Sequence, residues 1–129
     1  WCCLVGSEMC IRDRINSILR KVVTNGTASL SDVEGYEIGG KTGTAQLVEN
    51  GLYTNKKINT FASVFPISDP KYVLVILLED TKLSKDYVYK YRNKPGSFEG
   101  TPFNTAGWTS VEIAGKIIDK IGPILATKY

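Results

Sequence analysis

Apolar residues near the start of the chain recur three and four positions apart, which is the spacing of a helix with one buried face. The positions are Ile15, Ile18, Leu19, Val22 and Val23. Asn25-Gly26 follows them, and glycine readily takes the left-handed conformation that is common just after a helix. The pattern predicts a helix that begins near residue 15, buries one stripe and is closed by Asn25-Gly26.

The same spacing returns near the end of the chain. The apolar positions there are Val111, Ile113, Ala114, Ile117, Ile118 and Ile121. Thr109 or Ser110 can cap the first turn of this second helix, and Gly122-Pro123 is expected to stop it.

The middle of the chain lacks a helical period and is predicted to form strands. A Thr- and Gly-rich stretch predicts a strand centred on residues 41–47, followed by a turn at Asn50-Gly51. Further strands are expected at residues 60–65 and 72–78. The last of these is apolar almost throughout, which predicts burial on both faces. The link between the last two strands is too short for a parallel crossover, so we expect them to pair antiparallel.

Residues 81–107 are rich in Lys, Tyr, Asn and Gly and show little period, which predicts a long loop. Loops of this length are uncommon unless they are functional or mobile. The element order is helix, three strands, helix, with no internal repeat. Helices that flank an antiparallel sheet predict an α+β fold.

Composition narrows the classes of function. The 129 residues are 43% hydrophobic and 22% charged, which is ordinary for a chain that buries a core, and the net charge of +3 is spread along the sequence. This balance does not argue for nucleic-acid binding. The longest apolar run is Val73 to Leu78, whereas a membrane helix needs roughly 18 apolar residues or more.

Histidine is absent, which removes the commonest general base and the commonest zinc ligand. The cysteines are Cys2, Cys3 and Cys10, and no second pair of thiols follows to complete a metal site. We therefore expect neither a bound metal nor a cofactor.

The first fourteen residues contain every cysteine and the only methionine, and they show no clear period. We expect residues 1–14 to be a non-native or read-through segment and residues 15–129 to be the folded part. The alternative is a true helix start, with Ser7 as N-cap and Glu8 in the first turn.

Residues 35–42, GYEIGGKT, fit the pattern G-x-x-x-x-G-K-[ST] of a phosphate-binding loop. Such a loop leaves a strand and opens directly into a helix, whose N-terminus cradles the phosphates. Here a helix and a polar connection come before it, and Gly43, Thr44 and Val48 follow where the first helical turns should be. A nucleotide-binding module is therefore the weaker alternative.

If the same segment is a strand, Lys41-Thr42-Gly43-Thr44 forms the K-T-G box of serine acyl-transferases that act on D-alanyl peptides and β-lactams. Three blocks in order and spacing resemble the transpeptidase domain of class B penicillin-binding proteins, of the cell-division type. They are ILRKVVTNGTAS (18–29), GGKTGTAQ (39–46) and TFASVFPISDPKYVLVILLED (60–80), followed by Ala106-Gly107-Trp108. The resemblance implies the C-terminal part of a serine β-lactamase/transpeptidase-like fold.

Each residue of the box has a physical role in this interpretation. Thr42 and Thr44 share one face of the strand and can donate to a carboxylate, while Lys41 points to the other face and adds positive charge. Gly43 removes a side chain where substrate backbone comes close, and the strand edge can pair with an extended peptide. By resemblance, the backbone N–H of Thr44 is one of two oxyanion-hole donors, and Lys41 also contacts the serine of an S-x-N box.

The two other boxes of the family are not found in the sequence. Only Ser68 has a lysine three residues on, at Lys71, and it lies in a Pro-bounded turn; Ser17, Ser29 and Ser31 do not complete S-x-N. We expect an N-terminal truncation that removes the nucleophile, so that the chain alone is inactive.

The resemblance implies a parent D,D-transpeptidase that cross-links peptidoglycan through an acyl-serine. The expected partners are peptidoglycan stem peptides, β-lactams, the missing N-terminal half of the domain and cell-division proteins, with no nucleic acid. The expected location is the periplasmic side, with a membrane anchor in the missing part. The alternative within the same chemistry is a β-lactam sensor or class D β-lactamase.

Overall fold

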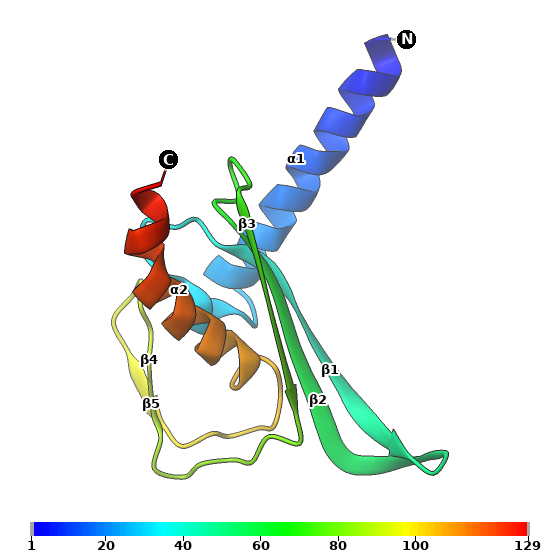
Figure 1. Cartoon of the computed structure of the whole chain (residues 1–129), viewed down its shortest axis with the longest axis vertical. Helices are drawn as coiled ribbons and strands as arrows, with labels where there is room; N and C mark the ends of the chain where they lie inside the picture. The colour runs from blue at the N-terminus through cyan, green and yellow to red at the C-terminus, as the bar shows by residue number, and fades with distance from the viewer. Residues whose placement is uncertain (1, 129) are drawn as a thin grey trace.

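The computed structural model describes residues 2–128, with side chains from residue 8 onward. The chain forms α1 (Cys2–Thr24), the 3-10 turn η1 (Ser29–Ser31), β1 (Gly39–Glu49), β2 (Leu52–Phe65), β3 (Tyr72–Glu79), β4 (Val88–Lys90), β5 (Ser97–Glu99) and α2 (Ser110–Ala126). β1, β2 and β3 pair in that order as an antiparallel sheet, and α2 packs on one of its faces (Figure 1). The predicted α+β class and the antiparallel pairing of the last two strands are confirmed.

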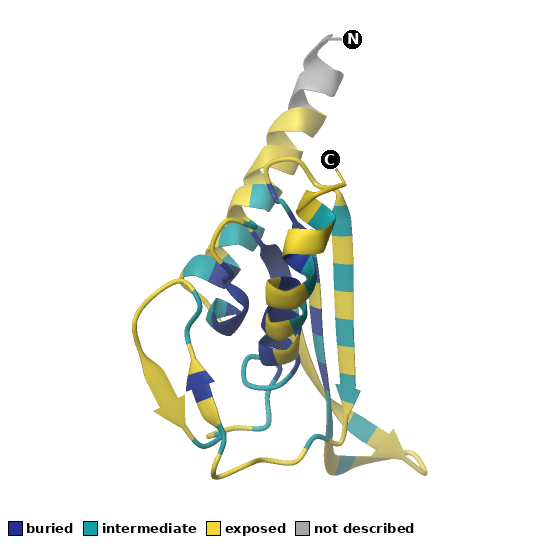
Figure 2. Cartoon of the chain, turned by 60° about the vertical axis from the view of Figure 1, so that its left-hand side comes forward, coloured by how far each residue is buried: buried dark blue, intermediate teal, exposed yellow. Residues whose placement is uncertain are grey.

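The sheet has an inner face that carries the core and an outer face that does not. Side chains of the inner face, α2, η1 and the end of α1 form the core together; the largest fully buried apolar side chains are Val23, Ile38, Phe61, Val111 and Ile118. Figure 2 shows this buried layer between α2 and the sheet. The core therefore lies on one side of the sheet only.

The prediction that the third strand is buried on both faces is wrong for this chain. Along β3 half-buried and exposed residues alternate, and Val73, Val75 and Leu77 are 75%, 57% and 62% exposed. The strand pleat sends these three side chains to the outer face, which no element of the described chain covers. Among the described residues, only one face of this apolar run is packed.

The first helix is longer and less buried than predicted. α1 runs without a break from Cys2, so it passes through Ser7 rather than beginning there. Val23 is fully buried, but Ile15 and Ile18 are 49% and 60% exposed, because this part of α1 extends away from the sheet (Figure 1). The predicted end at Asn25 is confirmed.

The predicted stop of the second helix is also wrong. α2 continues through Gly122-Pro123 to Ala126, and its N-cap residue, Thr109, makes no side-chain cap bond. A Cβ added at Gly122 would lie 2.3 Å from the Tyr36 ring. This glycine therefore makes room for a neighbouring ring instead of ending the helix.

The hairpin between β1 and β2 is longer than predicted. The Asn50-Gly51 turn is confirmed, with φ of 52° and 77° at the two residues, as in the turn type that suits tight hairpins. β2 begins at Leu52 rather than residue 60, so residues 46–57 form an arm that projects beyond the rest of the sheet (Figure 1). Residues 81–107, predicted as a loop, contain the small β4–β5 hairpin.

Candidate functional site

The K-T-G segment is extended and lies at the edge of the sheet. β1 pairs with β2 alone among the described residues, in a register that sets Lys41 opposite Ala62 and Thr44 opposite Asn59. No helix follows Thr42, as β1 continues to Glu49. This geometry excludes the phosphate-binding loop, which needs a helix N-terminus at that point.

Thr42 and Thr44 line a cavity of about 320 Å³ on the inner side of β1, which we call the threonine pocket. Its lining comes from three parts of the chain: Gly26, Thr27, Ser29 and Leu30 after α1, Thr42 and Thr44 of β1, and Tyr91 with Thr105, Ala106, Gly107 and Trp108 before α2. The pocket is thus rich in hydroxyl groups and bordered by two aromatic rings. Such a lining can hydrogen-bond a polar chain end.

The two threonine hydroxyls have different partners. The oxygen of Thr42 lies 3.0 Å from that of Thr27, and either atom can be the donor. The oxygen of Thr44 accepts a hydrogen bond of 3.0 Å from the backbone N–H of Ala106. Thr27 and Ala106 were not among the site residues expected from the sequence.

Lys41 does not line the threonine pocket. Its side chain is exposed, and its Nζ donates to the backbone oxygen of Thr42 at 2.7 Å. The pleat therefore places the ammonium group of Lys41 and the hydroxyls of Thr42 and Thr44 on opposite faces of β1. A ligand can reach both only at the edge of the strand.

The glycines of β1 fall into two kinds. A Cβ at Gly39 would lie 2.6 Å from Cδ1 of Ile67, and one at Gly40 would lie 2.6 Å from the Ala62 carbonyl oxygen and 2.8 Å from the Phe61 ring. A Cβ at Gly43 would meet nothing closer than 4.0 Å. Packing within the chain explains the first two glycines and leaves Gly43 open.

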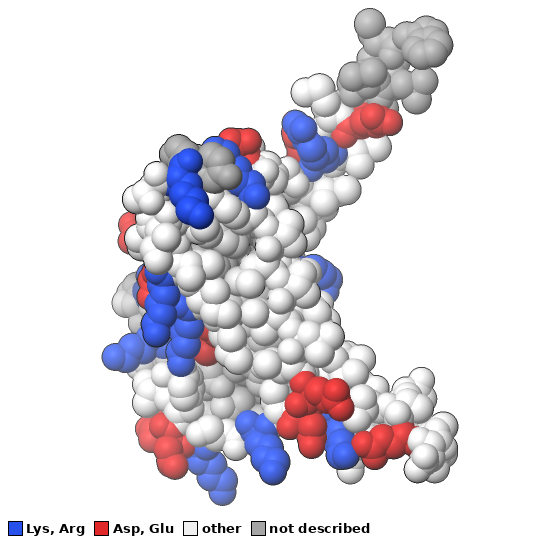
Figure 3. All heavy atoms as spheres, viewed as in Figure 1, with Lys and Arg blue, Asp and Glu red and all other residues white. Residues whose placement is uncertain are grey.

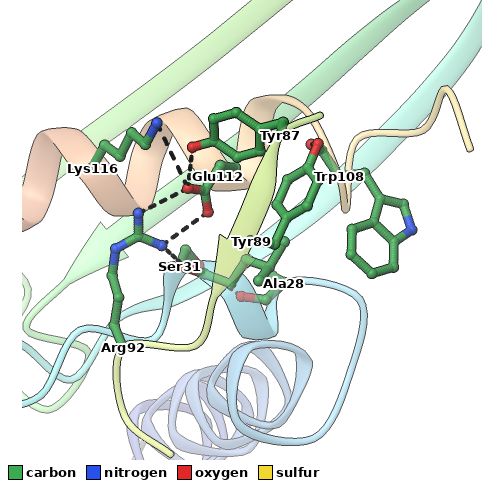
Figure 4. Close-up of polar contacts among 9 residues, drawn as sticks. Ala28, Ser31, Tyr87, Tyr89, Arg92, Trp108, Glu112 and Lys116 are labelled. Atoms are coloured by element: carbon green, nitrogen blue, oxygen red, sulfur yellow. Dashed lines mark hydrogen bonds and ion pairs between the residues drawn. The ribbon is translucent and has the colours of Figure 1, made fainter. Parts of the chain in front are cut away.

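A charged network fixes the segment between β3 and α2 (Figure 4). The buried carboxylate of Glu112 accepts from Arg92 at 3.0 and 3.2 Å and from the Tyr87 hydroxyl at 2.9 Å, and Lys116 lies 3.9 Å away. Arg92 also donates to the backbone oxygen of Leu30. The network joins the segment to both α2 and η1, so residues 81–107 are not a free loop.

Tyr89 makes a second attachment of this segment. Its hydroxyl donates to the Trp108 carbonyl at 2.8 Å, and the two rings meet edge to face at 5.2 Å. Burial raises the pKa of Tyr89 above its usual value of 10, which keeps the hydroxyl protonated. Tyr89 thereby holds Trp108 at the rim of the threonine pocket.

Charged side chains gather away from the middle of the sheet. Figure 3 shows them on α1, near the C-terminal end of α2, around the segment between β3 and α2 and near the base of the hairpin arm, while much of the surface between these places is neither basic nor acidic. On the arm, Lys56 donates to Glu49 at 2.7 Å, and this hydrogen bond raises the pKa of Lys56. Among the described residues no group of three His, Cys, Asp or Glu side chains could hold a metal ion, and no helix there has the length and apolarity to cross a membrane.

Comparison with known proteins gives one consistent result. Residues 11–96 match the family described as penicillin binding protein transpeptidase domain. A peptidoglycan D,D-transpeptidase FtsI homolog of Chlorokybus atmophyticus is 44% identical over 68 residues, 51% of this chain and 10% of that protein. A probable peptidoglycan D,D-transpeptidase FtsI of Caulobacter vibrioides is 30% identical over 110 residues, 80% of this chain and 16% of that protein.

Solved structures agree with the fold. The transpeptidase domain of FtsI4 D,D-transpeptidase from Legionella pneumophila superposes with a TM-score of 0.57 at 26% identity, over 84% of this chain and 34% of that one. A D,D-transpeptidase domain from Eggerthella lenta gives a TM-score of 0.52 at 23% identity. The chain therefore spans about a third of the first of these structures and, as above, a tenth to a sixth of the curated relatives.

Proposed function

Because the chain belongs to the penicillin-binding protein transpeptidase domain family and is similar to its FtsI-like, class B members, we propose that it supplies the substrate-binding strand of a peptidoglycan D,D-transpeptidase. In this proposal β1 binds the D-alanyl end of a stem peptide. Thr42 and Thr44 donate to the terminal carboxylate, and Lys41 contributes positive charge at the edge of the strand. β-Lactams occupy the same place.

The observation that carries the proposal is the open space over Gly43. No atom outside its own neighbours comes closer than 4.0 Å to the position of its missing Cβ, and its φ lies outside the left-handed region that favours glycine. Neither packing nor backbone geometry of this chain therefore requires glycine there. The missing Cβ of Gly43 points to the face of Lys41, away from the threonine pocket, and its absence leaves that side of the β1 edge clear for a substrate backbone.

The edge position of β1 supports the same interpretation. An unpaired strand edge offers backbone N–H and C=O groups to an extended peptide. We propose that the Thr44 N–H is one of the two donors that stabilise the oxyanion of the tetrahedral intermediate. Loss of one such donor lowers the rate by about 10² to 10³ in a comparable acyl-transfer site.

We propose that the serine nucleophile lies in another part of the polypeptide than this sequence. The only Ser-x-x-Lys, Ser68 to Lys71, lies between β2 and β3 and not on a helix; there Ser68 donates to Glu37 and Lys71 pairs with Asp69 at 3.3 Å. The chain alone is then inactive, since loss of a serine nucleophile costs about 10⁶ in kcat in a comparable enzyme.

The reaction proposed for the whole protein has two steps. The serine hydroxyl attacks the carbonyl of the penultimate D-alanine, and the terminal D-alanine leaves with the proton on its amine. An amine from a neighbouring peptidoglycan strand then attacks the ester carbonyl. The amide cross-link forms, and the serine hydroxyl is released. The D-alanyl chemistry implies an extracytoplasmic site, with a membrane anchor outside residues 15–129; the non-native origin of residues 1–14 stays a prediction.

The test begins with the coding DNA upstream of codon 15. We expect an in-frame S-x-x-K followed by S-x-N, and a protein expressed from that frame that is labelled covalently by a fluorescent penicillin and holds the label for hours. Rapid release of hydrolysed penicillin would identify a β-lactamase instead. A continuous upstream frame without either box would contradict the proposal.

A further inference from the structure

We propose that Asn59 is a positioning residue that presets the Thr44 hydroxyl as a hydrogen-bond donor toward the carboxylate of the bound peptide. This inference rests on the proposed function. It concerns a residue on β2 that has no contact with the peptide itself and acts through residues 104–106.

Asn59 is the centre of a closed polar cluster. Its side chain is fully buried, and its Nδ2 donates to the Thr81 hydroxyl at 2.9 Å and to Oδ1 of Asn104 at 2.7 Å. The Thr81 hydroxyl donates to the same Oδ1 at 2.7 Å, and Nδ2 of Asn104 donates to the Thr81 carbonyl at 2.9 Å. The cluster ties β2 to both ends of the segment between β3 and α2.

The cluster fixes the backbone that contacts Thr44. Ala106 follows Asn104 by two residues and is 1% exposed, and its N–H donates to the Thr44 oxygen. Asn59 and Thr44 are partners in the register of β1 and β2. The Asn59 side chain, which orders residues 104–106, therefore lies on the neighbouring strand, directly beside the Thr44 hydroxyl that Ala106 contacts.

The consequence follows from what each group can do. A backbone N–H can only donate, so in the bond with Ala106 the Thr44 oxygen can only accept. The hydroxyl hydrogen of Thr44 is then left for another acceptor, and Thr44 is exposed. A carboxylate is an acceptor only, so the hydroxyl meets it with its hydrogen already available. Thr42 differs, because its bond with Thr27 joins two hydroxyls and can use either hydrogen.

The contribution of Asn59 to stability does not by itself explain an asparagine at this buried position. Its Oδ1 is buried and has no hydrogen-bond partner among the described residues, and an unsatisfied buried acceptor costs free energy of folding. What the residue supplies is a pair of N–H donors at one point, which an apolar side chain cannot replace. This favours a role in holding residues 104–106 over a role in filling the core.

The experiment compares the wild-type chain with Asn59→Leu, Thr44→Val and the double variant. Asn55→Leu, on the exposed arm of the same strand, is the control. Hydrogen exchange of the Ala106 amide is followed by NMR without ligand. Affinity is then measured for a peptide ending in D-alanyl-D-alanine and for its C-terminal amide. If Asn59→Leu does not fold, Thr81→Val is used in its place, because it removes one hydroxyl of the cluster.

We expect Ala106 to exchange at least tenfold faster in Asn59→Leu and in Thr44→Val, and to be unchanged in Asn55→Leu. The preference for the carboxylate over the amide should fall about tenfold in Asn59→Leu, and no further in the double variant than in Thr44→Val alone.

Two results overturn the inference while the proposed function stands: unchanged protection of Ala106 in Asn59→Leu, or an equal loss of carboxylate preference from Asn59→Leu with and without Thr44. A wild-type chain that does not distinguish carboxylate from amide contradicts the proposed function and with it the role of Asn59 in binding. The exchange data are separate from that outcome and still decide whether Asn59 orders Ala106.

Discussion

The two ends of the segment from Gly39 to Gly43, at the start of β1, contain glycine in different surroundings. At the closed end, Gly39 and Gly40 leave no space for a Cβ, because Ile67, Phe61 and the Ala62 carbonyl occupy it. At the open end, Gly43 has free space above it, beside an exposed lysine and two hydroxyls. Packing within the chain accounts for the closed end but not for the open one, where the proposed substrate backbone would lie.

The largest loss of stability is expected when the Phe61 side chain, which packs at the closed end, is truncated. The ring is fully buried in the core and lies against Gly40. We expect Phe61→Ala to lower the free energy of unfolding by about 3–5 kcal/mol, measured by urea denaturation. A loss below about 1 kcal/mol would show that the closed end is not packed as described.

A smaller loss is expected from Gly40→Ala. The new methyl group would meet backbone and ring atoms of β2, and overpacking of this kind costs about 1–3 kcal/mol. Urea denaturation measures the change in the free energy of unfolding of this variant, and the change in Gly43→Ala is compared with it. An unchanged stability would remove the distinction between the two ends.

Gly43→Ala should act in the opposite direction. Glycine within a strand is less stable than alanine by about 0.5–1 kcal/mol, and no atom opposes the added methyl group, so the variant should gain about that much. It should also lose affinity for the D-alanyl peptide, because the methyl group occupies the space of the substrate backbone. A stability loss like that of Gly40→Ala would mean that packing explains Gly43 after all.

The smallest effect is expected on the outer face of the sheet, at Val75. This residue pairs with Ala62, which in turn pairs with Lys41. Val75 is 57% exposed, and Val75→Thr keeps its shape and its branched Cβ. We expect a change within about 0.5 kcal/mol and a peptide affinity equal to the wild type. A large loss in stability would indicate that this face is covered in solution.

Local patterns in the sequence predicted much of the fold. The Asn50-Gly51 turn, the three strands and the end of α1 each depend on residues close in sequence, and they were predicted. The first half of β2 was missed because the arm around Lys56 is polar on both sides and gives no alternation. The exposure of Val75 could not be predicted, since an apolar strand carries no sign of which face its own chain covers.

Sequence motifs could name only some residues of the candidate site, for the same reason. Lys41, Thr42, Gly43 and Thr44 are adjacent in sequence, so a short motif could identify them as candidates. Asn59 and Ala106 are brought to Thr44 by contacts between residues 59, 81 and 104, and such distant contacts leave no pattern in one sequence. Their roles stay proposals until tested.

The most direct test of the account follows the backbone amides of β1 by NMR while a peptide ending in D-alanyl-D-alanine is added. The account predicts that the shifts concentrate on residues 41–44, that the C-terminal amide of the same peptide binds at least tenfold more weakly, and that Gly43→Ala abolishes the shifts. Equal binding of both peptides, or shifts that leave residues 41–44 unchanged, would contradict the claim that this strand edge binds the peptide carboxylate.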